Sequence, residues 1–175
     1  MADEIEAKVK VDSLDSVRQR LLDAGAERVG KVLEVNTYYR LADADCGLRT
    51  RLETDETGGT RGRVTFKGCR QPGPYKRREE IEFDASDTAA AGLLFERLGH
   101  GRALVFEKRR ETFALAGCEV VLDELPTLGT FVEVEGETED AVTAVLKRLG
   151  LGGHESLQQG YASMIAATGE TELRF

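Results

Sequence analysis

The chain is poor in several residue types that mark common protein classes. It has 175 residues but only three cysteines, three prolines, two histidines and no tryptophan. Cys46, Cys69 and Cys118 are far apart in the sequence and form no C-x-x-C pair, which argues against a disulfide framework or a structural zinc site. We therefore expect three small, reduced side chains in a cytoplasmic protein.

Long apolar segments are missing as well. No segment approaches the ~20 apolar residues of a membrane span, and the acidic start MADEIEAK lacks the apolar centre of a signal peptide. The net charge of −8 disfavours a broad nucleic-acid-binding surface. These features predict a cytoplasmic protein that binds neither membranes nor nucleic acids.

Alternation with period two runs through most of the chain. In residues 4–11, Glu4, Glu6, Lys8 and Lys10 share one face and the apolar residues share the other, which is typical of a β-strand. The same pattern predicts further strands at residues 32–40, 47–53, 61–68, 77–84, 103–115, 118–123 and 130–136.

Helix signals separate these strands. Capping residues and closing glycines bound three predicted helices, namely Ser13 and Gly25, Ser86 or Asp87 and Gly99, and Thr138 and Gly150. A last helix is predicted at about residues 156–167, and residues 68–75 form a loop rich in glycine and proline. Strand–helix–three strands thus occurs twice, in a single domain of residues 1–167 with a flexible tail at 168–175.

The polar strand faces carry long charged side chains grouped by sign. Arg49, Arg51, Lys67, Lys108 and Arg110 form a basic set, and Glu4, Glu6, Glu133 and Glu135 form an acidic set. One interpretation is an ordinary solvated sheet face. The other is a closed antiparallel sheet, which has no free edges, with a basic wall and an acidic wall across one cavity. Carboxylates around a cation suit Mg²⁺ or Mn²⁺, and Arg and Lys suit phosphate oxygens.

A series of motifs resembles one known family. Glu4-Ile5-Glu6-Ala7-Lys8 is similar to the ExExK signature of the CYTH superfamily, the triphosphate tunnel enzymes. The other matching segments, in chain order, are residues 36–39, 48–51, 65–68, 76–82, 108–110, 122–123, 128–129, 131 and 133–135, with Tyr161 in the last helix. The resemblance spans about residues 4–165. It implies an α+β fold, a closed antiparallel eight-stranded β-barrel with helices packed outside.

The resemblance also implies roles for the charged residues. Glu6 and Glu133 are the expected Mg²⁺ or Mn²⁺ ligands, assisted by Glu4, Asp123 and Glu135. The expected triphosphate clamp is Lys8, Arg49, Arg51, Lys67, Arg78, Lys108 and Arg110, of which Lys67, Lys108 and Arg110 are the candidate catalytic residues. Glu80 and Glu82 are either further acidic lining or partners of the arginines.

Among the superfamily, the chain looks most like class IV adenylyl cyclases, in which the ribose 3′-oxygen attacks the α-phosphorus and pyrophosphate leaves. One alternative is an inorganic or thiamine triphosphatase, with Tyr38 or Tyr39 beside Lys67 or Lys108 to activate water. Another is a non-catalytic sensor of nucleotides or polyphosphate. Two departures count against the cyclase: no His-Phe pair precedes Glu4, and Asn36 stands where relatives often have Asp. A homodimer is compatible with the resemblance.

Overall fold

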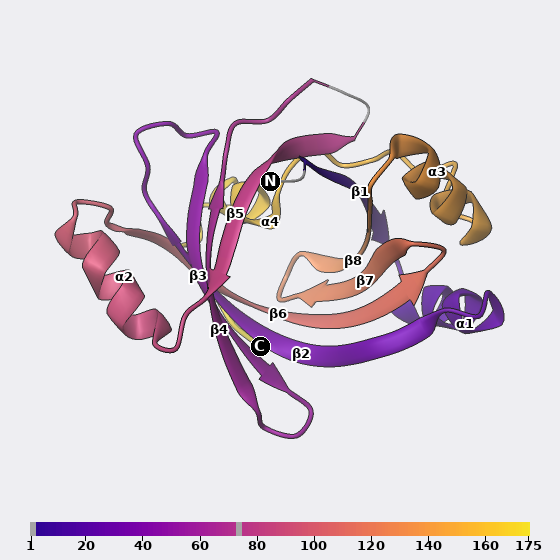
Figure 1. The fold of residues 1–175 in the computed structure, drawn as a ribbon, viewed down its shortest axis with the longest axis horizontal. Coiled ribbons are helices and arrows are strands. Elements are labelled where there is room, and N and C mark those ends of the chain that lie inside the picture. Colours follow the sequence, from indigo (N-terminus) through magenta and orange to yellow (C-terminus); the bar gives the residue numbers. More distant parts are fainter. Residues whose placement is uncertain (1–2, 73–74) are drawn as a thin grey trace.

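The computed structural model describes residues 3–72 and 75–175. Eight long strands make the sheet: β1 (Asp3–Val11), β2 (Glu27–Tyr39), β3 (Gly47–Asp55), β4 (Thr60–Lys67), β5 (Lys76–Asp84), β6 (Arg102–Leu115), β7 (Cys118–Leu125) and β8 (Gly129–Gly136). The helices α1 (Leu14–Asp23), α2 (Thr88–Arg97) and α3 (Glu139–Arg148) lie outside the curl of the sheet, while α4 (Tyr161–Ala166) is seen through its opening (Figure 1). The predicted antiparallel, β-rich fold with few helices is confirmed.

The strand order follows the predicted duplication. The sheet runs β2-β3-β4-β5-β1-β8-β7-β6, and β2 also pairs with β6. The first strand of each half therefore lies beside the last strand of the other half, β1 beside β8 and β5 beside β4. All of the pairings among these eight strands are antiparallel. This agrees with the predicted hairpins, because a short turn can join only antiparallel strands.

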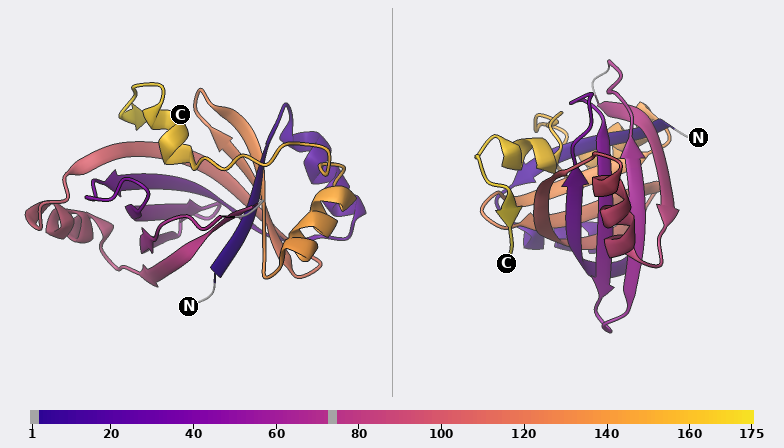
Figure 2. Two further views of the ribbon diagram at one scale, coloured as in Figure 1. Left: turned by 90° about the horizontal axis from the view of Figure 1, so that it is seen from above. Right: turned by 90° about the vertical axis from the view of Figure 1, so that its left-hand side faces the viewer.

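The sheet curls until β2 pairs with β6, so all eight strands are joined in one ring, but the curl stays open to solvent rather than forming the sealed cylinder that we expected (Figure 2). Hydrogen bonds between β2 and β6 link the two ends of the strand order over most of both strands, from Glu27 to Tyr39. The seam between β1 and β5 is much shorter, because it joins only Asp3–Glu6 to Lys76–Glu79. A short seam allows the walls to part, so the interior stays open to solvent.

The apolar core lies on the outer face of the curl. In β1, Ile5, Ala7 and Val9 are buried and belong to the core cluster that includes Val17 of α1 and Val145 of α3. The alternating residues of the same strand point the other way, toward the interior of the curl. Side chains alternate strictly across a strand, so burying the apolar face under helices turns the charged face inward.

Sequence patterns placed the early helices well. Ser13, Asp87 and Thr138 each cap a helix by accepting a hydrogen bond from a backbone N–H, as predicted. The last helix was predicted too long, since it begins at Tyr161 rather than near residue 156. The preceding segment is held against β1 instead: the Leu157 N–H donates to the Lys8 carbonyl at 2.7 Å.

The C-terminal segment, predicted as a flexible tail, packs against β6. Its residues Glu172–Leu173 form β9, which pairs in parallel with Val105 and Phe106. Leu173 is buried in the core cluster around α4, and Arg174 Nη1 lies 2.9 Å from Glu107 Oε1. None of the helices in the described residues is long and apolar enough to cross a membrane.

Candidate functional site

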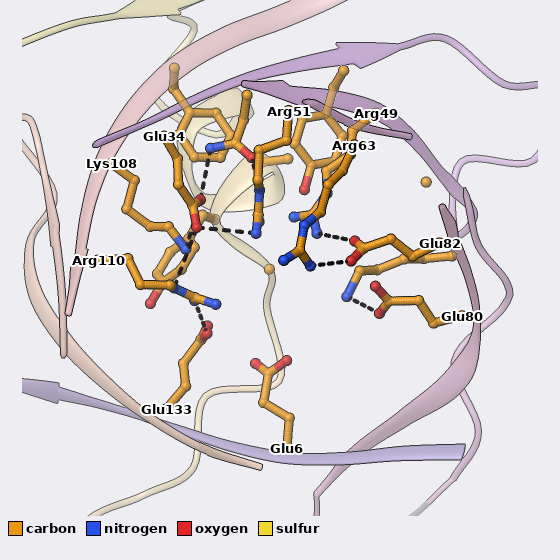
Figure 3. Close-up of a pocket in the computed structure, with 18 of the residues that line it drawn as sticks. Glu6, Glu34, Arg49, Arg51, Arg63, Glu80, Glu82, Lys108, Arg110 and Glu133 are labelled. Carbon is orange, nitrogen blue, oxygen red and sulfur yellow. Dashed lines mark hydrogen bonds and ion pairs between the residues drawn. The ribbon is translucent and has the colours of Figure 1, made fainter. Parts of the chain in front are cut away.

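The charged faces of the strands line one cavity of about 1430 Å³ (Figure 3). Every residue that we predicted for the triphosphate clamp lies on its wall: Lys8, Arg49, Arg51, Lys67, Arg78, Lys108 and Arg110. Glu6, Glu133 and Glu135 of the predicted metal set line it too. The interpretation of these faces as a solvated exterior is therefore wrong, because the apolar faces occupy the outside.

Sheet register brings opposite charges face to face across neighbouring strands. Lys8 of β1 is opposite Glu133 of β8, and Glu34 of β2 is opposite Lys108 of β6. Cross-strand neighbours have Cβ atoms about 5 Å apart, so long side chains meet easily. The expected segregation into a basic and an acidic wall is too simple, since carboxylates are interleaved with the cations.

Glu34 is the centre of the cationic part and was not among the predicted site residues. Its carboxylate is fully buried and lies 3.1 Å from Arg51 Nη1, 3.2 Å from Lys108 Nζ and 3.7 Å from Arg110 Nε. Burial opposes its charge, but these three cations hold the pKa of Glu34 well below its usual value. A signal existed in the sequence: Glu34 shares the face of Asn36 and Tyr38 within the predicted strand.

Replacement of Glu34 by glutamine should destabilise the ligand-free protein by about 2 kcal/mol, because three buried cations lose their shared counter-charge. Because the pKa of Glu34 is lowered in the folded protein, its ionised carboxylate stabilises the fold fully at pH values above the ordinary glutamate pKa. This stabilisation is lost as the pH falls toward the lowered pKa. Urea unfolding at neutral and at acidic pH should therefore show a difference between wild type and Glu34→Gln that shrinks in acid. A pH-independent difference would contradict the ionic role.

Arg110 connects the cationic and acidic parts of the cavity. Its guanidinium donates to Asp123 Oδ1 at 2.8 Å and to Asp123 Oδ2 at 2.6 Å, and it also bonds Glu133. Asp123 is fully buried and additionally accepts from Lys108 Nζ at 3.3 Å and from Tyr161 Oη at 2.9 Å. With this many donors, Asp123 is suited to hold Arg110 and Lys108 in place rather than to bind a metal.

The acidic part of the cavity is built by β1 and β8. Lys8 Nζ lies between two carboxylates, 3.2 Å from Glu6 Oε1 and 3.0 Å from Glu133 Oε1. Burial lowers the pKa of Lys8, but Glu133 and Glu6 outweigh burial and raise it overall. Glu135, opposite Glu6 in the register, lines the same region, whereas the predicted ligand Glu4 has its side chain outside the described residues.

Carboxylate oxygens converge here, and that donor set fits a hard divalent cation such as Mg²⁺ or Mn²⁺. Glu6 and Glu133 are nearly buried yet reach the cavity. Lys8 Nζ lies between the Glu6 and Glu133 carboxylates, which shows that this position attracts positive charge. The residues therefore fit the metal that the sequence predicted.

Glu80 and Glu82 line the cavity and also pair with cations, so both roles left open by the sequence apply to them. Glu82 accepts from Thr65 Oγ1 at 2.7 Å, pairs with Arg63, and lies 3.6 Å from Arg49 Nη2. Glu80 forms an ion pair with Lys67, its neighbour in the register. Arg63, which we did not place in the clamp, also lines the cavity.

The two adjacent tyrosines of β2 have different surroundings. Tyr38 lines the cavity and stacks on Phe106 with 5.8 Å between ring centroids. Burial opposes ionisation, but Arg49 and Lys67 lower the pKa of its phenol overall. Tyr39 is buried against α2, where its ring meets Phe95 edge to face. Of the two candidates for water activation, Tyr38 therefore has the required cationic surroundings.

Comparisons with known proteins agree with this geometry. A family model described as CYTH domain matches residues 2–161. A relative from Methanocaldococcus jannaschii, named as a candidate adenylate cyclase, is 27% identical and aligns with 92% of this chain and 97% of its own. The PH1012 protein structure from Pyrococcus horikoshii superposes with a TM-score of 0.80 at 25% identity, covering 91% of this chain and 98% of that one.

A more distant fold relative comes from Hippeastrum. This candidate adenylyl cyclase, described as having a dominant triphosphatase activity, superposes with a TM-score of 0.66 at 18% identity. The match covers 97% of this chain and 97% of that chain. At this identity the likeness shows a shared fold.

Proposed function

Because the chain belongs to the CYTH domain family, we propose that it is a metal-dependent enzyme that converts ATP into cyclic AMP and pyrophosphate. The observation that carries this proposal is one cavity lined by lysine and arginine from β1, β3, β4, β5 and β6 beside the carboxylates of Glu6 and Glu133. Its volume, about 1430 Å³, exceeds the ~300–1,000 Å³ of common small-molecule sites and accommodates a nucleotide. The name of the M. jannaschii relative supports the same reaction class.

The cations have separate tasks in this proposal. Arg49, Arg51, Lys67 and Arg78 bind the β- and γ-phosphates, since guanidinium groups match phosphate oxygens and tolerate burial. Arg110, held by Asp123 at 2.6–2.8 Å, contacts the α-phosphate, where negative charge builds up as the bond to the β-phosphate breaks. A fixed guanidinium stabilises that charge without reorganising.

Lys108 is the residue that we assign to the proton of the ribose 3′-hydroxyl. Burial and the neighbouring Arg110 lower the pKa of Lys108, while Asp123 and Glu34 partly oppose them. A lowered lysine pKa brings a base closer to neutrality. The 3′-oxygen then forms the bond to the α-phosphorus, and the bond between that phosphorus and the bridging oxygen breaks to release pyrophosphate.

Glu6 and Glu133 would hold Mg²⁺ or Mn²⁺, with Glu135 beside them, and the bound ion would supply charge neutralisation for the phosphates. Lys8, between Glu6 and Glu133, keeps these carboxylates oriented and balances their charge. Asp123, with its hydrogen bonds to Arg110, Lys108 and Tyr161, is assigned a positioning role.

Hydrolysis of inorganic or thiamine triphosphate is the second candidate function. Two observations favour it: the Tyr38 phenol lies in the cavity with a pKa lowered by Arg49 and Lys67, and the Hippeastrum fold relative is described as mainly a triphosphatase. If water rather than ribose were the nucleophile, Tyr38→Phe should reduce turnover strongly. The same change should leave cyclisation nearly intact, since Tyr38 has no part in it.

Product analysis by mass spectrometry separates these reactions. Purified protein is incubated with Mn²⁺ or Mg²⁺ and with ATP, tripolyphosphate or thiamine triphosphate in turn. We expect cyclic AMP and pyrophosphate in equal amounts from ATP. Orthophosphate from tripolyphosphate without cyclic AMP would overturn the cyclase in favour of the hydrolase, and tight binding of all three without product would identify a sensor.

A further inference from the structure

Two cysteines and an aspartate lie together beside the cavity, whose wall includes Cys46. Cys46 immediately precedes β3 and Cys69 follows β4, while Asp43 lies in the connection between β2 and β3. The Cys46 and Cys69 sulfurs are 3.5 Å apart, and Cys69 Sγ is 3.3 Å from Asp43 Oδ2. All three donor atoms lie within 4.8 Å of one another.

The β3–β4 register determines that Cys46 and Cys69 lie close together. Gly47 and Lys67 are opposite each other in the β3–β4 register, so the residues just beyond this end of the hairpin must be neighbours. Arg70 then ties the two segments together, because its backbone N–H and its Nε donate to the Asp45 carboxylate at 2.7 and 2.6 Å. Asp45 in turn donates its own N–H to Asp43 Oδ1 at 2.9 Å.

The distances fit coordination better than a disulfide. A tetrahedral zinc ion with Zn–S bonds of about 2.3 Å places two sulfur ligands about 3.8 Å apart, and a sulfur and an oxygen ligand about 3.5 Å apart. The observed separations of 3.5 and 3.3 Å are close to these values. A disulfide needs the sulfurs at about 2.05 Å, so both side chains would have to move.

We propose that Asp43, Cys46 and Cys69 bind one Zn²⁺ ion, with water in the fourth position. Two thiolates and one carboxylate suit zinc and disfavour Mg²⁺, which prefers oxygen ligands only. This ion is separate from the metal proposed at Glu6 and Glu133. It would join the β2–β3 connection to the segment after β4, beside Arg78, whose Nη1 donates to the Asp45 carbonyl at 3.4 Å.

The electrostatics at the three donors agree with a cation between them. A divalent ion at their centre would relieve the mutual repulsion of the anionic donors. Arg70, the arginine in the same segment as Cys69, is engaged by Asp45 and leaves Asp43 to the ion.

Titration with Co²⁺ alone, and then with Zn²⁺, tests the site in reduced protein without phosphate compounds. We expect one equivalent of Co²⁺ to give thiolate-to-metal charge-transfer absorption, displaced by Zn²⁺ and unaffected by excess Mg²⁺. Cys46→Ser and Cys69→Ser should each abolish this band. Asp43→Asn should weaken Zn²⁺ binding by at least about tenfold. Cys118→Ala, which removes the buried thiol of the core, is the matched control and should retain full binding.

Circular dichroism of each variant confirms that it is folded, so that loss of the band reports on the site. A folded wild-type protein without the charge-transfer band would overturn the proposal. So would a band that survives both serine variants, or a wild-type protein isolated with a Cys46–Cys69 disulfide whose reduction restores no metal binding. None of these results would bear on the cyclase proposal, which is read from products formed with Mg²⁺ or Mn²⁺.

Discussion

Arg110→Ala is expected to weaken tripolyphosphate binding by about 2 kcal/mol, roughly 30-fold in Kd, and to reduce turnover of ATP by about 10²–10³. Arg110 lies where the cationic and acidic parts of the cavity meet, so its loss removes charge at the position assigned to the reacting phosphate. Asp123 keeps Lys108 and Tyr161 as partners, which allows the variant to fold. Calorimetric titration with tripolyphosphate and a cyclic AMP assay measure the two effects.

Arg109→Ala supplies the matched control. Arg109 is the preceding residue of β6, but its side chain is 45% exposed on the outer face, where it pairs with Glu124 at 3.3 Å and stacks on Phe175. The same atoms are deleted on the opposite side of the strand, and we expect binding and turnover to stay within about twofold of wild type. Equal losses in both variants would show that general charge, rather than the cavity position, binds the phosphates.

Glu133→Gln should reduce metal-dependent turnover by about 10²–10³ at fixed Mn²⁺, with partial recovery at higher Mn²⁺ concentrations. The substitution removes one anionic ligand and keeps the side-chain volume. Lys8 retains Glu6 as its counter-ion at 3.2 Å, so the fold should persist. Activity measured over a series of Mn²⁺ concentrations gives the apparent affinity for Mn²⁺, which should be lower in the variant because the site has lost one negative charge.

Glu124→Gln is the control for this prediction. Glu124 follows Asp123 on β7 and is 45% exposed on the outer face, paired with Arg109. Its loss should leave the Mn²⁺ dependence unchanged. An unaltered Mn²⁺ dependence in Glu133→Gln itself would remove Glu133 from the metal site and leave it the role of a partner of Arg110 and Lys8.

The site could be predicted in outline because strand alternation is a local property. Charged residues at every second position identify one face of a strand, whatever the strand pairs with. The seven clamp residues, which the resemblance to the CYTH superfamily implied, lie on such faces, and all of them line the cavity. Alternation does not show which carboxylate contacts which cation, because that depends on the register between neighbouring strands. The structure was therefore needed to assign the roles of Glu34, Glu80, Glu82 and Asp123.

The sequence by itself determined the order of strands and helices, the capping residues, and the faces that carry charge, since each depends on neighbours within a few residues. Only the tertiary structure decided that the charged faces turn inward, with α1 and α3 packed on the apolar face of β1 and β8. It also decided that the C-terminal segment packs on β6 and that Cys46 meets Cys69. These contacts join residues far apart in the chain, and pairing between distant strands brings them together.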